Sequence, residues 1–140
     1  MKTAACMPDK FSTTVIYVDG AGCRPDGSGS GYAWTQVGTQ RQRVIWKNGL
    51  TNNEAEYRAV ISALQKAPPG CRIEVRCDSQ LVCCQFEGTY AVKDPKLKRL
   101  LARLEALIEE RDLQVRLRWV PRRENLADTL LQRKPLRDGR

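Results

Sequence analysis

The sequence predicts an α/β fold, with helices packed on both faces of a mixed five-stranded sheet. Three β-type segments follow one another near the start of the chain with short links, which is typical of an antiparallel meander. Two later β-type segments each follow a helical pattern, and such crossovers favour parallel pairing. The 140 residues, 41% of them hydrophobic, suffice for one core. We therefore expect a single domain over residues 1–140.

The meander is read from runs of β-branched and aromatic residues. Thr13–Val18 is the first such run, and it stops at Asp19-Gly20. The glycine- and serine-rich segment Ala21–Gly31 is expected to be a loop. Tyr32–Val37 and Gln42–Lys47 are the second and third strands.

Capping residues mark the expected helix starts in the rest of the chain. Thr51 offers N-cap chemistry with Glu54 three residues behind it, and Pro95 suits the first turn of a helix. The expected elements, in chain order, are a helix between Thr51 and Pro68, a strand Arg72–Cys77, a short helix from Ser79 to about Phe86, a long helix from Pro95, a strand Gln114–Val120 and a last helix Glu124–Arg133.

The two ends of the chain are expected to lie outside the packed core. Residues 1–11 form a loose N-terminus and residues 134–140 a basic C-terminal tail. No apolar run is long enough to span a bilayer, and Met1–Lys10 has no secretory apolar region. We expect a complete chain that is a cytoplasmic monomer, in which the leucine stripe of the long helix packs into the core.

The charge and the cysteine content of the chain indicate which binding partners and metal sites it can have. The net charge of +8 suits a polyanion such as nucleic acid, although basic surface can serve solubility alone and an anionic membrane is a weaker alternative. There are six cysteines and no histidine, and no two cysteines form a CxxC pair. A structural zinc site is therefore disfavoured, free thiols are expected, and one disulfide stays open.

Four carboxylates occupy positions that suit a metal site. Asp19 closes the first strand, Asp78 closes the fourth, Glu56 lies one turn inside a helix, and Asp128 lies in the last helix. If the first and fourth strands are parallel neighbours, Asp19 and Asp78 emerge at one end of the sheet. Each residue alone could be a turn, a cap, a solvated helix residue or a surface ion pair. The joint pattern predicts a Mg²⁺ site with two ions, which clamp the attacking and leaving oxygens at phosphorus.

Five segments in order resemble the motifs of type 1 ribonuclease H. They cover residues 13–131 and read TVIYVDGAG, SGSGYAW, TNNEAEYRAVISAL, VRCDSQLV and WVPRRENLADTL. The similarity is strongest to the compact form found in archaea and many bacteria. It implies a ribonuclease H-like fold and an endonuclease that cuts the RNA strand of RNA–DNA hybrids by a two-metal-ion mechanism, leaving 5′-phosphate and 3′-hydroxyl ends.

The resemblance also assigns residues and ligands. It implies Mg²⁺ as the cofactor, with Mn²⁺ as a substitute, an RNA–DNA hybrid as partner, and double-stranded RNA as an open alternative. The catalytic, metal-binding residues are Asp19, Glu56, Asp78 and Asp128. The substrate-binding residues are Gly20, Ala21, Gly22, Cys23, Asn52, Asn53, Gln80, Arg122 and Arg123.

The chain departs from that family pattern in three places. Arg122 or Arg123 stands where relatives carry a histidine, and its role would be electrostatic because arginine keeps its proton. Asn125 and Asp128 are three residues apart instead of four, which puts the register of Asp128 in question. A tryptophan-rich DNA-gripping insertion is missing, and basic residues at the start of the long helix either replace part of it or are simply solvated. These residues are Lys93, Lys96, Lys98 and Arg99.

Other functions are also compatible with the predicted fold. An inactive hybrid-binding module and a different nuclease of the same fold are the alternatives, and a piece of a reverse transcriptase or a fused phosphatase is a further one. Clustered carboxylates near phosphate argue against a pure binder.

Trp34, Trp46 and Trp119 lie on expected strands, so we predict that they pack in the core.

Overall fold

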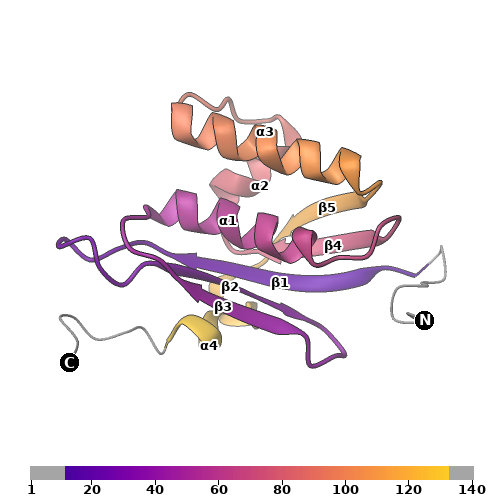
Figure 1. Ribbon diagram of the computed structural model, residues 1–140, viewed down its shortest axis with the longest axis horizontal. Coiled ribbons are helices and arrows are strands. Elements are labelled where there is room, and N and C mark those ends of the chain that lie inside the picture. Colours follow the sequence, from indigo (N-terminus) through magenta and orange to yellow (C-terminus); the bar gives the residue numbers. More distant parts are fainter. Residues whose placement is uncertain (1–11, 133–140) are drawn as a thin grey trace.

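The computed structural model describes residues 12–132, so the expectations for residues 1–11, for Arg133 and for the tail 134–140 lie outside the described residues. The regular elements alternate much as the sequence predicts (Figure 1). In chain order they are β1 (Thr14–Ala21), β2 (Gly31–Gln36), β3 (Gln42–Trp46), α1 (Asn52–Gln65), β4 (Arg72–Cys77), α2 (Gln80–Glu87), α3 (Pro95–Glu110), β5 (Gln114–Trp119), the 3₁₀ turn η2 (Arg122–Glu124) and α4 (Asp128–Leu131).

The five strands form one mixed sheet in the order β3-β2-β1-β4-β5. β1 pairs antiparallel with β2, and β2 pairs antiparallel with β3, which confirms the meander. β4 pairs parallel with both β1 and β5, as expected for strands reached through helical crossovers. The predicted arrangement of three antiparallel strands followed by two parallel ones is confirmed.

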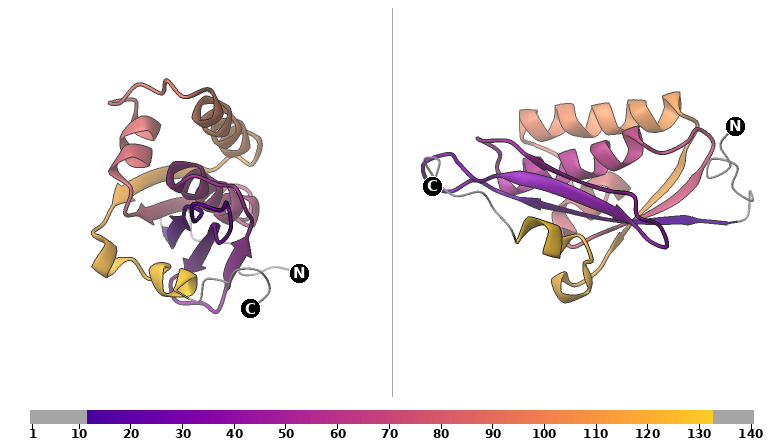
Figure 2. Two further views of the ribbon diagram at one scale, coloured as in Figure 1. Left: turned by 90° about the vertical axis from the view of Figure 1, so that its left-hand side faces the viewer. Right: turned by 60° about the horizontal axis from the view of Figure 1, so that its bottom comes forward.

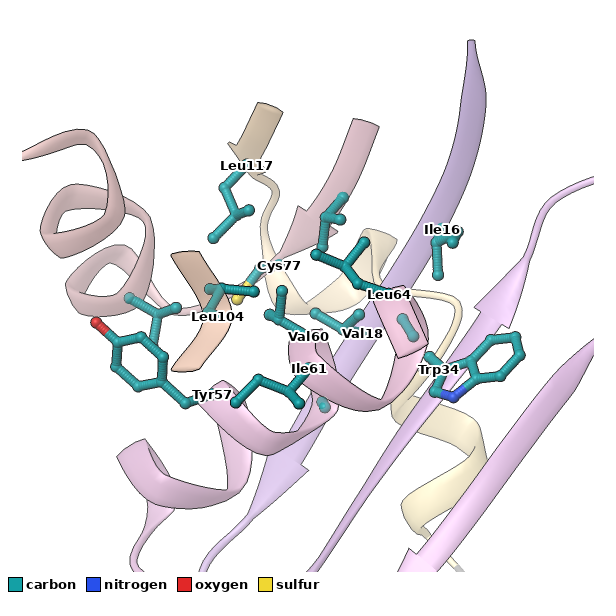
Figure 3. Packing of buried hydrophobic residues seen from close by; sticks show 14 of the residues in the cluster. Ile16, Val18, Trp34, Tyr57, Val60, Ile61, Leu64, Cys77, Leu104 and Leu117 are labelled. Atoms are coloured by element: carbon teal, nitrogen blue, oxygen red, sulfur yellow. The ribbon is translucent and has the colours of Figure 1, made fainter. Parts of the chain in front are cut away.

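Helices lie on both faces of the sheet. Figures 1 and 2 show α1, α2 and α3 on one face and the short α4 on the other. The main core lies between the sheet and α1, where Val18, Val60 and Leu64 are fully buried (Figure 3). Tyr57 is also buried, and its hydroxyl donates to Gln85 Oε1 at 2.7 Å, so its polar atom is satisfied inside the core.

Local capping chemistry sets the helix starts. Thr51 caps α1 in a capping box, accepting from the Glu54 amide while the Glu54 side chain accepts from the Thr51 amide. Ser79 caps α2 and Asp94 caps α3. The start of α1 fixes where Glu56 stands, and the start of α2 follows directly on Asp78.

Three predictions are wrong in detail. β1 does not stop at Asp19-Gly20 but continues to Ala21, because residues 19–21 keep pairing with β2. The predicted helix Glu124–Arg133 is instead the turn η2 and the single turn α4, because Asn125 between them is extended. Trp119 is 44% exposed, since it ends the edge strand β5.

Two further features are the state of the cysteine thiols and the character of the helices. Cys77 and Cys83 are buried free thiols, and Cys23 and Cys84 are also free. Within residues 12–132, no helix combines the length and the apolar character that crossing a membrane requires.

Candidate metal and active site

Three carboxylates from three elements converge at the carboxyl end of β1 and β4. Asp19 lies on β1, Asp78 directly follows β4, and Glu56 lies on α1, and one ligand oxygen from each falls within 4.8 Å of the others. The parallel pairing of Tyr17 with Arg76 explains why Asp19 and Asp78 meet, since Asp19 lies two residues further along β1 and Asp78 follows Arg76 by two residues, directly after β4.

Gly20 brings the third carboxylate close. A Cβ on Gly20 would lie 2.4 Å from the Ala55 carbonyl carbon and from the Glu56 nitrogen. Only glycine therefore allows α1 to approach β1 this closely, and the approach carries Glu56 to the strand end.

The cluster is buried and strongly coupled. Asp19 is 3% exposed and Glu56 is 6% exposed. Burial, followed by the charge of Asp78 and a side-chain hydrogen bond with Asp128, raises the pKa of Asp19 to about 7. Burial, followed by the charges of Asp19 and Asp78, raises the pKa of Glu56 to about 9. Without a cation, the folded protein therefore retains protons that these carboxyl groups would lose in water.

The remaining hydrogen-bonding capacity of the cluster suits a cation. The Gly20 amide donates to Asp19 Oδ1 at 3.0 Å and lowers the pKa of both Asp19 and Glu56. Glu56 Oε1 is buried and has no hydrogen-bond partner among the described residues. A buried carboxylate oxygen without a donor is costly, and a hard divalent cation would satisfy it.

Asp128 lies beside the cluster, next to Asp19. Its side chain hydrogen-bonds with Asp19, and its charge also raises the pKa of Asp19. It is not one of the three residues whose ligand atoms lie within 4.8 Å of one another. Its other carboxylate contact is Gln132 Nε2, which donates to Asp128 Oδ2 at 3.2 Å.

Asn125 is a site residue that sequence reasoning used only as a marker of spacing. It is 4% exposed, and its Nδ2 donates to the Val18 carbonyl at 2.9 Å and to Asp78 Oδ2 at 3.0 Å. Its Oδ1 accepts from the Ala127 amide at 3.0 Å. Asn125 thus ties β1, the Asp78 carboxylate and the start of α4 together, and only its place in the ENLAD segment hinted at this.

The residues expected to bind substrate lie around the cluster. Gly20 and Ala21 end β1, and the Gly22 amide donates to Asn52 Oδ1 at 2.6 Å, which fastens the following loop to the start of α1. Arg122 lies close enough for its charge to lower the pKa of Glu56. The others lie on flanking segments: Cys23 in the loop after β1, Asn53 in the first turn of α1, Gln80 at the start of α2 and Arg123 in η2.

Comparison with known proteins agrees with this geometry. The model of a family described as RNase H matches residues 12–128. Ribonuclease HI of Halobacterium salinarum is 33% identical over 98% of this chain and 71% of its own length. Ribonuclease H of Methylorubrum extorquens is 35% identical over 76% of this chain, but the match spans only about half (51%) of that protein.

Solved structures are similar over most of the chain. The RNase H1 from Halobacterium salinarum superposes with a TM-score of 0.76 at 33% identity, covering 87% of this chain and 96% of that one. LC11-RNase H1, solved in complex with an RNA/DNA hybrid, gives a TM-score of 0.75 at 32% identity, covering 84% of this chain and 92% of that one.

Proposed function

The chain belongs to the ribonuclease H family, and we propose that it hydrolyses the RNA strand of RNA–DNA hybrids at the Asp19–Glu56–Asp78 cluster, with Asp128 as the fourth carboxylate. The observation that carries this proposal is the convergence of three carboxylates within 4.8 Å. A relative of similar fold, LC11-RNase H1, was solved bound to an RNA/DNA hybrid, which supports the choice of substrate.

The residues present fit a pair of divalent metal ions. The cluster of Asp19, Glu56 and Asp78 offers only oxygen ligands, which Mg²⁺ prefers and Mn²⁺ accepts. Glu56 Oε1, which has no hydrogen-bond partner among the described residues, can bind a cation. Asp128 would complete the set from beside Asp19. When bound, two such ions would lower the pKa of an attacking water and stabilise the leaving 3′ oxygen.

The chain's own residues prepare the site for this chemistry. The Gly20 amide orients Asp19, and Asn125 orients Asp78, so two ligands hold their positions before anything binds. The high pKa of Glu56 and Asp19 means that metal binding must displace protons. Hydrolysis by water breaks the P–O3′ bond and leaves 5′-phosphate and 3′-hydroxyl ends without a covalent enzyme intermediate.

Selection of RNA would come from Glu56 and from the residues around the cluster. Glu56 can serve both a metal and the 2′-hydroxyl that distinguishes RNA from DNA. Main-chain groups of residues 20–23 would follow the RNA backbone, and Asn52, Asn53 and Gln80 would contact the strands from the helix starts. Arg122 and Arg123 would supply positive charge near the phosphates.

An inactive hybrid-binding module is the competing function. It would gain nothing from a buried cluster whose carboxylates raise one another's pKa. We therefore favour catalysis, in a cytoplasmic and monomeric protein, with double-stranded RNA as a possible second substrate.

The test is cleavage of an end-labelled RNA–DNA hybrid in Mg²⁺, in Mn²⁺ and in EDTA, beside all-DNA and all-RNA duplexes. We expect metal-dependent cutting of the RNA strand and an intact DNA strand. Asp19→Asn should be inactive, whereas the matched control Asp94→Asn, at an exposed helix cap, should stay active. Millimolar Mg²⁺ should also raise the Tm of the wild type. Tight hybrid binding without cutting in either metal would instead indicate the binding module.

A further inference from the structure

One part of the sheet surface is rich in arginine and covered by no described helix. Across the parallel pair β4–β5, Arg72 lies opposite Gln114, Glu74 opposite Arg116, and Arg76 opposite Arg118. These residues point away from α1, α2 and α3, because Ile73, Val75 and Leu117 between them fill the core. On that side of the sheet, α4 packs against β1 and β2 (Figure 1). We call the four arginines of this surface, Arg72, Arg76, Arg116 and Arg118, the arginine face.

Only part of this positive charge is neutralised locally. Arg76 Nε donates to Glu74 Oε2 at 2.6 Å, its Nη1 donates to the Tyr17 hydroxyl at 2.8 Å, and its guanidinium lies 5.3 Å from the centre of the Tyr17 ring. Arg118 Nη1 is 3.6 Å from the same Glu74 oxygen, and its side chain is 54% exposed. Four arginines and one glutamate leave a net charge of +3 on one side of two strands.

Fold stability accounts for only part of this arrangement, since Arg72 Nε donates to Gln114 Oε1 at 3.3 Å and Arg76 pairs with Glu74. Like charges directly opposite each other on a sheet are destabilising, and Arg76 and Arg118 are such a pair. Charged side chains on an edge strand prevent edge-to-edge pairing, which would explain Arg116 and Arg118 on β5. It does not explain Arg72 and Arg76, because β4 lies between β1 and β5.

The arginine face adjoins the carboxylate cluster. Asp78 follows Arg76 by two residues, and Asp19 follows Tyr17 by two residues on the neighbouring strand. Tyr17 and Asp19 both lie on β1, so they point to the same side and are separated by roughly 6.5 Å, and Asp78 directly follows β4. A polyanion positioned at the carboxylates would therefore meet the guanidinium groups next, along the same side of the sheet.

We propose that the arginine face binds backbone phosphates of the nucleic acid on one side of the cleavage site, with Arg116 and Arg118 as the contacting residues. This rests on the proposed function. Guanidinium groups bind phosphate through two parallel hydrogen bonds. Arg76, held by Glu74 and Tyr17, is a positioning residue that keeps Glu74 from pairing fully with Arg118. The terminal segments 1–11 and 133–140 carry more basic than acidic side chains, so charge disfavours them as occupants.

The test compares two double variants of equal charge. Arg116→Gln/Arg118→Gln removes the contacting residues, and Arg43→Gln/Arg103→Gln removes two exposed arginines from β3 and α3. Both are made in an Asp19→Asn background, so that the hybrid is bound but not cut. The affinity for a fluorescent hybrid of about 20 base pairs is measured by anisotropy in EDTA over a range of KCl concentrations.

Loss of two phosphate contacts should raise Kd roughly tenfold at low salt. It should also reduce the slope of log K against log[KCl] by about 2, because each neutralised phosphate contributes about 0.9. Arg116→Lys/Arg118→Lys should restore the slope, and the Arg43/Arg103 variant should change it far less. Equal slopes for the two glutamine variants would overturn the inference while leaving the proposed function intact. A wild type that neither binds nor cuts the hybrid would overturn both.

Discussion

Replacing Asp19 by asparagine should stabilise the metal-free protein while abolishing cleavage. The fold raises the pKa of Asp19 from 3.8 to about 7, mainly through burial and the charge of Asp78. Each tenfold change in proton affinity is worth about 1.4 kcal/mol, so ionised Asp19 opposes folding by about 4 kcal/mol above pH 7. Asparagine carries no charge and can still accept from the Gly20 amide, so we expect roughly 2–4 kcal/mol of this to be recovered.

The sign of the pH dependence follows from the direction of the shift. Because the pKa in the folded state is raised, the destabilisation is absent below about pH 4, where Asp19 is protonated in both states, and it is complete above about pH 7. The advantage of Asp19→Asn should therefore vanish near pH 4 and be largest at pH 8. For a domain of this size, 1 kcal/mol corresponds to roughly 3 °C, so the Tm should rise by roughly 6–12 °C at pH 8.

The assay is thermal unfolding followed by circular dichroism in EDTA, from pH 4 to pH 8.5, for the wild type, Asp19→Asn and Asp94→Asn. Asp94 is an exposed N-cap, and asparagine caps a helix equally well, so this control should follow the wild type. A difference between Asp19→Asn and the wild type that stays constant with pH, or a lower Tm for Asp19→Asn at pH 8, would refute the electrostatic argument.

Two further substitutions test how the site is held together. Asn125→Ala removes a buried amide that donates to the Val18 carbonyl and to Asp78. We expect the free energy of unfolding in urea to fall by about 2–4 kcal/mol and Mg²⁺ to raise the Tm less than in the wild type. An unchanged response of the Tm to Mg²⁺ would contradict the role of Asn125 in orienting Asp78. Gly20→Ala should cost several kcal/mol and abolish cleavage, because its Cβ would lie 2.4 Å from two backbone atoms of α1. The Cβ of Gly22→Ala would meet the Asn52 side chain at 2.5 Å and one backbone atom, the Asn52 nitrogen, at 2.8 Å, so this variant should cost less. Equal stabilities of the two alanine variants would count against the close approach of α1 to β1.

Much of the fold could be predicted because its signals are local. The box formed by Thr51 and Glu54 and the cap and proline at Asp94-Pro95 mark helix starts within a few residues, and the structure confirms them. The order of strands and crossovers then left few ways to arrange the sheet. Placing Asp19 and Asp78 at the same end of the sheet needed only that topology.

The errors lie where a distant contact decides the outcome. Helical propensity alone favoured a helix over Glu124–Arg133, but Asn125 is held in an extended conformation by a hydrogen bond to Val18, 107 residues away. Trp119 is a large apolar residue of the kind that fills cores, yet it ends β5, which no other described strand pairs with on its outer side. Neither the hydrogen bond of Asn125 to Val18 nor the edge position of β5 can be inferred from the neighbouring sequence.

The short spacing between Asn125 and Asp128 shows how the same contact shapes the site. Because Asn125 is fixed to β1 and to Asp78, its Oδ1 and its carbonyl oxygen can accept from the amides of Ala127 and Asp128, and the chain enters α4 directly at Asp128. The chain thus makes a tight turn between Asn125 and Asp128. Asp128 reaches Asp19 at one side of the cluster, where the two carboxyl groups share a hydrogen bond when no metal is bound. Asp128 thus lies next to Asp19, whose charge in turn raises the pKa of Glu56.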